Sequence, residues 1–135
     1  MHMFENDQYF RQLKKGVLEM IVLKTLSHKK MYGYQVMMTL KYESDYFFNL
    51  CAGTLYPLLH RLEKNGLLKS TWESPEPGKM PKTYYEITDE GRVELAAQTE
   101  LWATFSDHVF HIMTSHKFKT IQKPLPIPVF SHNHP

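Results

Sequence analysis

The sequence predicts a mainly α-helical fold with one small β-hairpin, an α+β arrangement that ends in a long helix. Residues 51–68 space their leucines for one face of a helix, and residues 89–115 repeat a helical spacing over a longer stretch. Between them, residues 68–73 and 82–88 are short runs suited to strands, joined by a loop with three prolines and a glycine. Two strands joined in this way form a hairpin.

The composition limits the chain to one domain with a modest core and no dominant charge. In 135 residues, 16 lysines and arginines against 14 carboxylates give a net charge of +2. Any affinity for nucleic acid must therefore come from the local placement of charge. A single cysteine excludes an internal disulfide framework, and the sequence has no signal-like N-terminus or long apolar run. We therefore expect a cytoplasmic protein without a membrane partner.

The sequence lacks the motifs of the common enzyme classes. It has no nucleophile elbow, no phosphate-binding loop and no paired-carboxylate motif, so we expect no catalytic residues and no cofactor. His108 and His111 are three apart on a predicted helix, a spacing that can bind zinc. Because a third and a fourth ligand are not evident, we expect no metal site.

Two helices precede the leucine-rich one. Residues 8–27 are predicted to form a single helix with a broad apolar face, which we expect to be covered by the domain itself and by a partner subunit. Gly33 permits a tight entry into the second helix, residues 34–42. The segment that follows, residues 43–50, carries aromatic side chains at 46–48 that are too apolar for a free loop. We expect a short strand or a plug against the hairpin there.

The third helix has one apolar and one polar face. The buried stripe is predicted to consist of Leu55, Leu58, Leu59 and Leu62. The opposite face presents Gly53, Pro57, His60 and Lys64, with Tyr56 and Arg61 on its flanks. Pro57 must lie in or near the first turn, and Gly66 marks the end of the helix. Such a helix is a candidate for insertion into a DNA groove, although an ordinary core helix with a solvated face fits equally well.

The hairpin makes the DNA interpretation the better one. Three helices followed by a hairpin with a basic tip is the order of a winged helix-turn-helix. In that fold the last of the three helices enters the major groove, and the wing follows the neighbouring backbone. Lys79 and Lys82 lie at or beside the tip of the wing, where a long side chain can reach a phosphate.

A combination of short motifs resembles the PadR family of bacterial transcriptional regulators. The resemblance runs from about residue 13 to about residue 113, and its most specific pieces are Gly53-Thr54-Leu55-Tyr56-Pro57, His60-Arg61-Leu62-Glu63, Gly66-Leu67, Trp72, Lys82-Thr83-Tyr84-Tyr85, Ile87-Thr88 and Gly91. It implies a dimeric winged-helix repressor of the short type, with a single C-terminal dimerisation helix, whose operator affinity responds to a ligand or a stress signal. Thr83 and Glu86 stand where the family often has cations, so we expect weaker contacts between wing and phosphate.

Seven residues are predicted to contact double-stranded operator DNA: Thr54, Tyr56, His60, Arg61 and Lys64 on the helix, with Lys79 and Lys82 on the wing. The hydroxyls of Thr54 and Tyr56 are expected to donate hydrogen bonds to phosphates, which position the protein without reading sequence. His60 faces the groove most directly and is the best candidate for a base edge, such as guanine N7 or O6.

Two alternatives stay open at this interface. Arg61 lies on the flank of the helix, so an ion pair with Glu63 or Asp45 is as good an interpretation as a contact with DNA. The whole domain can also be a winged-helix protein–protein interaction module without direct DNA binding. That rival is favoured by the near-neutral charge and by the carboxylates around the wing, Glu73, Glu76 and Glu86.

The last helix is predicted to hold two subunits together. Thr88 is a plausible N-cap, and the apolar stripe beyond it has nothing in a small domain to pack against. We therefore expect a homodimer with Leu101, Trp102, Phe105, Val109 and Ile112 in its seam. In multidrug-binding members of the family, a tryptophan on this helix lines a flat pore. By that resemblance, Trp102 with Phe105 is expected to bind a planar aromatic small molecule, unless the tryptophan only fills the seam.

The remaining expectations concern Cys51 and the domain boundaries. Cys51 stands at the start of the third helix, where it is either a redox switch or, more simply, a small buried thiol. We expect residues 1–88 to form the DNA-binding domain and residues 89–116 the dimerisation helix. Residues 117–135 contain several prolines and are predicted to be a disordered tail.

Overall fold

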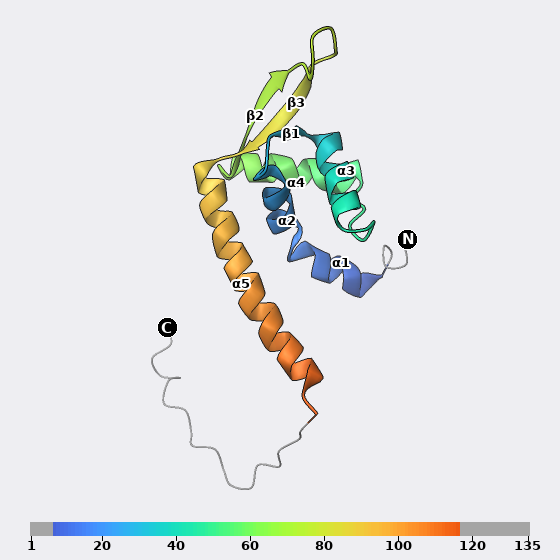
Figure 1. Ribbon diagram of the computed structural model, residues 1–135, viewed down its shortest axis with the longest axis vertical. Coiled ribbons are helices and arrows are strands. Elements are labelled where there is room, and N and C mark those ends of the chain that lie inside the picture. The colour runs from blue at the N-terminus through green and yellow to red at the C-terminus, as the bar shows by residue number, and fades with distance from the viewer. Residues whose placement is uncertain (1–6, 117–135) are drawn as a thin grey trace. The chain divides into compact units, whose positions relative to one another are not determined.

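The computed structural model describes residues 7–116, which contain five helices and a three-stranded antiparallel sheet (Figure 1). The elements are α1 (Gln8–Lys15), α2 (Leu18–Leu26), β1 (Met31–Tyr32), α3 (Gly33–Glu43), α4 (Ala52–Lys64), β2 (Leu68–Glu73), β3 (Lys82–Ile87) and α5 (Asp89–Thr114). This order confirms the predicted fold class, a winged helix followed by a long C-terminal helix. The prediction for residues 117–135 falls outside the described residues.

The first predicted helix is in fact two helices. α1 ends at Lys15, where the N–H of Gly16 donates to the carbonyl of Leu13 and the N–H of Val17 donates to the carbonyl of Lys14. Val17 has a φ of −124°, outside the helical region, and α2 starts after it. Glycine is a poor helix former and Val17 is β-branched, so the chain turns here although the apolar spacing continues. As a result, α2 enters the core while α1 buries none of its side chains.

The core lies between α2, α3, α4 and the sheet. All four leucines predicted to form the inner stripe of α4 are buried, which confirms that prediction. Cys51 is the N-cap of α4, Pro57 is its sixth residue, and Gly66 takes a φ of +79° just past its end. The same leucines fix the rotation of α4 about its axis, and therefore decide which of its residues face solvent.

The sheet places β3 between β1 and β2. The predicted hairpin is confirmed, with Glu73 opposite Lys82 and Leu68 opposite Ile87. β1 was not predicted, since two residues carry no alternating pattern; it pairs Tyr32 with Tyr84. Figure 1 shows the wing, formed by β2 and β3, extending away from α2, α3 and α4.

The segment between α3 and α4 is neither a strand nor a plug against the wing, so that prediction is wrong. Asp45 and Tyr46 have φ values of 51° and 68°, which turn the chain sharply after α3. The turn directs Phe47 and Phe48 onto Phe10 of α1, with ring centroids 5.2 and 6.4 Å away. The apolar side chains therefore pack on the first helix.

α5 begins as predicted. The Thr88 hydroxyl accepts the N–H of Gly91 at 3.0 Å and donates to the carbonyl of Gly66 at 2.6 Å. By contacts the chain divides into two units, one through Ala103 and one from Thr104, so the first part of α5 belongs to the winged-helix unit. Within residues 7–116, no helix is both long and apolar enough to cross a membrane.

Candidate nucleic-acid interface

α4 presents an outward face of small and basic residues. Four predicted members of this face are exposed: Gly53, Pro57, His60 and Lys64. Because the leucines on the other side are locked in the core, this face cannot rotate inward. Lys64 has no ion pair with any residue between 7 and 116, so its charge is available to an external anion.

Thr54 and Tyr56 are more buried than the sequence suggested. Both are only partly exposed, and Tyr56 packs against the hydrophobic core. Its hydroxyl end lies so close to Gly33 that a Cβ at that position would collide with the ring. Tyr56 therefore joins the start of α3 to α4, and Gly33 is required for this approach.

Arg61 is held by the body of the domain. Its Nε lies 3.7 Å from a carboxylate oxygen of Glu19 on α2, and the other oxygen of Glu19 accepts a hydrogen bond from Gln98 at 3.3 Å. The alternative prediction, an ion pair of Arg61 with Glu63 or Asp45, is therefore wrong, because the partner is Glu19. Glu63 instead accepts a hydrogen bond from the Ser70 hydroxyl at 2.6 Å, which ties α4 to β2.

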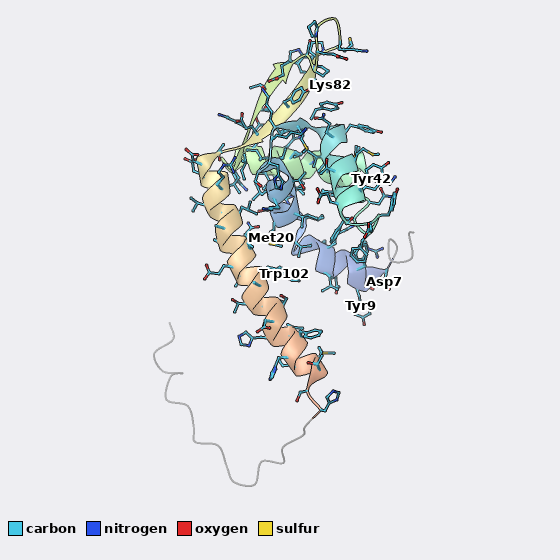
Figure 2. All side chains as sticks on the ribbon, viewed as in Figure 1. Asp7, Tyr9, Met20, Tyr42, Lys82 and Trp102 are labelled. Atoms are coloured by element: carbon cyan, nitrogen blue, oxygen red, sulfur yellow. The ribbon has the colours of Figure 1, made fainter. Side chains whose placement is uncertain are left out.

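The two wing lysines differ in their surroundings. Lys79 lies 4.0 Å from Glu76 in the loop. Lys82 lies at the start of β3, beside that loop (Figure 2), and its Nζ is 5.1 Å from the centroid of the Tyr32 ring. A ring face attracts an ammonium group through its quadrupole and does not neutralise its charge.

The sequence did not point to Lys30 or Tyr32. Lys30 makes an ion pair with Glu73, with Nζ–Oε distances of 2.9 and 3.0 Å. The hydrogen bond to Glu73 raises the pKa of Lys30, and hydrogen bonds from Thr71 and Lys30 lower the pKa of Glu73. These contacts depend on the pairing of β1 with β3, which no local pattern could reveal.

Cys51 is exposed, so the expectation of a buried thiol is wrong. As the N-cap, it lies outside the first turn of α4, and its Sγ is 3.5 Å from the Thr54 hydroxyl. That hydrogen bond, helped by backbone N–H groups, lowers the pKa of the thiol below its usual value. Among residues 7–116, no three His, Cys, Asp or Glu side chains gather as metal ligands would.

Trp102, labelled on α5 in Figure 2, lines a cavity of about 290 Å³ in the first unit. Its walls are almost entirely apolar and include Phe10, Leu13, Val17, Phe47 and Phe48. Trp102 is 44% exposed. Phe105, the other expected ligand residue, does not line the cavity and belongs to the second unit.

Both units carry large apolar side chains in solvent. On α1 these are Tyr9 and Leu13, and on α5 the expected seam residues are all exposed: Leu101, Trp102, Phe105, Val109 and Ile112. Monomeric proteins rarely leave large apolar patches uncovered. This exposure is what an interface between protomers requires.

Comparison with known proteins gives a consistent family. Residues 22–97, more than half of the chain, match the family described as Transcriptional regulator PadR-like family. A PadR family transcriptional regulator from Eggerthella lenta is 35% identical, with a TM-score of 0.69, over 80% of this chain and 91% of that one. A PadR-like transcriptional regulator from Bacillus cereus is 30% identical, with a TM-score of 0.68, over 78% and 99%. A Streptococcus transcriptional regulator is 33% identical, with a TM-score of 0.67, over 76% and 98%.

Proposed function

Because the chain belongs to the PadR-like family of transcriptional regulators, we propose that it is a homodimeric repressor that binds operator DNA through α4 and the wing. The observation that carries this proposal is the face of α4. Its inner leucines hold His60 and Lys64 outward, and the Lys64 charge has no ion pair in the described part of the chain. A transcriptional regulator with such a helix has the element that the major groove admits.

The seven candidate residues take different parts in this proposal. His60 reads a base edge, while Lys64 and Lys82 meet phosphates. The hydroxyls of Thr54 and Tyr56 donate hydrogen bonds to the phosphates of the DNA backbone from the edge of the helix. Their partial burial supports this positioning role. Lys79 and Arg61 contribute less, because each already faces a carboxylate.

The proposed dimer is supported by the apolar side chains on α1 and α5. In a two-fold dimer the α5 stripe of one protomer covers the equivalent stripe of its partner. Two copies of α4 are then spaced about one DNA turn apart, ~34 Å, which requires an operator with two related half-sites. The seam and the operator symmetry are therefore linked in one proposal.

We propose further that a planar aromatic molecule releases the repressor. The support is the apolar cavity beside Trp102, whose volume of about 290 Å³ suits a small ring system. Phe47 and Phe48 line the same cavity and lie in the segment between α3 and α4, so a bound ring would press on the segment that leads to the recognition helix. Quenching of Trp102 fluorescence by phenolic acids or planar cationic dyes, in a Trp72→Phe background, tests this step.

DNase I protection of the DNA upstream of the chain's own gene tests the repressor proposal. We expect two protected segments about one helical turn apart. Unlabelled random DNA should leave both segments protected, whereas unlabelled DNA that contains the specific site should remove both together. Protection that spreads evenly over random DNA contradicts a sequence-specific regulator at this site. Absence of protection at low salt favours the protein-binding winged helix.

A further inference from the structure

The wing is electrically balanced, so its net charge cannot attract DNA. Residues 68–87 contain three lysines and three glutamates. Lys69 pairs with Glu86 at 3.9 Å, and Lys79 pairs with Glu76 at 4.0 Å. The remaining two, Glu73 and Lys82, face each other directly across the hairpin. Opposite charges at facing positions normally pair, and such a pair would neutralise the last wing cation.

These two side chains form no ion pair with each other. Glu73 instead forms an ion pair with Lys30. Lys30 arrives from the turn before β1 and contacts both oxygens of Glu73, at 2.9 and 3.0 Å. The Thr71 hydroxyl donates to the same carboxylate at 2.7 Å. Both oxygens of Glu73 are thus engaged, one by Lys30 and the other by Lys30 and Thr71.

The ammonium of Lys82 rests on an aromatic support in place of a carboxylate. Its Nζ lies over the ring of Tyr32, and that ring meets Tyr84 edge to face, with centroids 5.3 Å apart. The Nζ of Lys30 lies 5.9 Å from the centroid of the Tyr84 ring. Two lysines therefore flank two tyrosines, and of these lysines only Lys30 is neutralised within residues 7–116.

We propose that Lys30 and Tyr32 are positioning residues for DNA binding: Lys30 withholds Glu73 from Lys82, and Tyr32 holds the still-charged Lys82 where it can meet a phosphate. The inference rests on the proposed function, since Lys82 needs DNA as its partner. It assigns Lys30 an effect on affinity without a contact of its own. It also selects Lys82 over Lys69 and Lys79 as the wing cation that contributes to the salt dependence.

A charge-release cycle on the full chain tests the proposal. Binding to a random 30-base-pair duplex and to the DNA upstream of the chain's own gene is measured by anisotropy over a range of salt concentrations. Lys30→Met frees Glu73 to pair with Lys82, so the salt slope falls by about 1 and affinity falls on the order of eightfold at 0.1 M salt. Glu73→Gln added to Lys30→Met restores both values. In a Lys82→Met background, Lys30→Met changes neither.

The matched control is Lys69→Met, which also removes one lysine charge, here from β2 itself, and leaves Glu73 engaged by Lys30. Any loss it causes is not restored by Glu73→Gln. If Lys30→Met leaves the slope unchanged, or if Glu73→Gln fails to restore it while the unsubstituted protein binds normally, the proposal is overturned and the repressor assignment stands. Failure of the unsubstituted protein to bind either duplex overturns both.

A second measurement reads the position of Lys82 without DNA. The ring current of Tyr32 shifts the ε-methylene signal of Lys82 upfield in a ¹³C-edited NMR spectrum, because the ammonium lies over the ring face. We expect Lys30→Met and Tyr32→Leu to remove this shift, and Glu73→Gln to retain it. Retention of the shift in Lys30→Met, with the fold intact by thermal unfolding, contradicts the role of Lys30.

Discussion

At the scale of single residues, α4 and α5 each have a glycine in their first turn, and the two glycines differ in how closely other parts of the chain approach them. Gly91 in the first turn of α5 is buried, and a Cβ there would collide with the carbonyl of Leu67 and press on Ile87. A Cβ placed on Gly53, in the first turn of α4, would meet only the Cys51 sulfur, at 3.9 Å. The two glycines occupy similar helical positions and differ only in what surrounds them.

Gly91→Ala should therefore destabilise the protein by about 1–3 kcal/mol, the usual cost of forcing an extra methyl group into packed structure. Gly53→Ala is the matched control. It should be neutral or stabilising by up to about 1 kcal/mol, because alanine is the better helix former and the site is open. Denaturant unfolding measures both, and equal effects would contradict the close approach at Leu67.

Cys51 gives a prediction about pH. The Thr54 hydroxyl is the largest cause of its lowered pKa, and a lowered pKa means more thiolate at neutral pH. Thr54→Val should raise the pKa of the thiol, so the reaction with iodoacetamide at pH 7 slows. The chain has one cysteine, so the rate reports that residue alone. A pH profile unchanged by the substitution would show that Thr54 has no effect on the thiol.

At the scale of elements, α4 carries two cationic side chains that differ in their ion pairing. Lys64 has no ion pair in the described part of the chain, whereas Arg61 pairs with Glu19. Lys64→Ala should lower the salt slope of DNA binding by about 1 and weaken binding to all sequences alike. Arg61→Ala should change the slope less. A larger effect at Arg61 would show that the residue leaves Glu19 to contact DNA.

The sequence could predict those elements whose signal is local. The leucine stripe of α4 and the two wing strands follow from spacing within each segment, so their burial and pairing were predicted. The break at Gly16 was missed because the apolar spacing continues through it. The packing of Phe47 and Phe48 on Phe10, and the pairing of Tyr32 with Tyr84, join segments far apart in the chain and leave no trace in local periodicity.

The site divides in the same way. The outward face of α4 was predicted because helical geometry alone decides which side opposes the leucines. The partner of Arg61 was not, since Glu19 is brought there by the packing of α2. The exposure of Cys51 follows from its position as the N-cap of α4. It was not predicted, because the sequence did not fix the first residue of the helix to within one position.

At the scale of the whole molecule, the account requires two protomers. Phe105 is 60% exposed in the second unit, on the stripe expected to form the seam. Phe105→Glu should dissociate the dimer, because it places a charge in a surface that must be apolar. Sedimentation equilibrium measures the change. Val93→Glu, at a 72% exposed position on the same helix outside the stripe, should leave the dimer intact.

The most direct test of the repressor assignment is an anisotropy titration of the unsubstituted protein against the DNA upstream of its own gene, with random DNA of equal length as reference. We expect nanomolar binding that weakens steeply between 50 and 200 mM salt, prefers the upstream DNA, and saturates at two protomers per site. Equal affinity for both DNAs, or no binding at the lower salt concentration, would contradict a sequence-specific repressor of this gene.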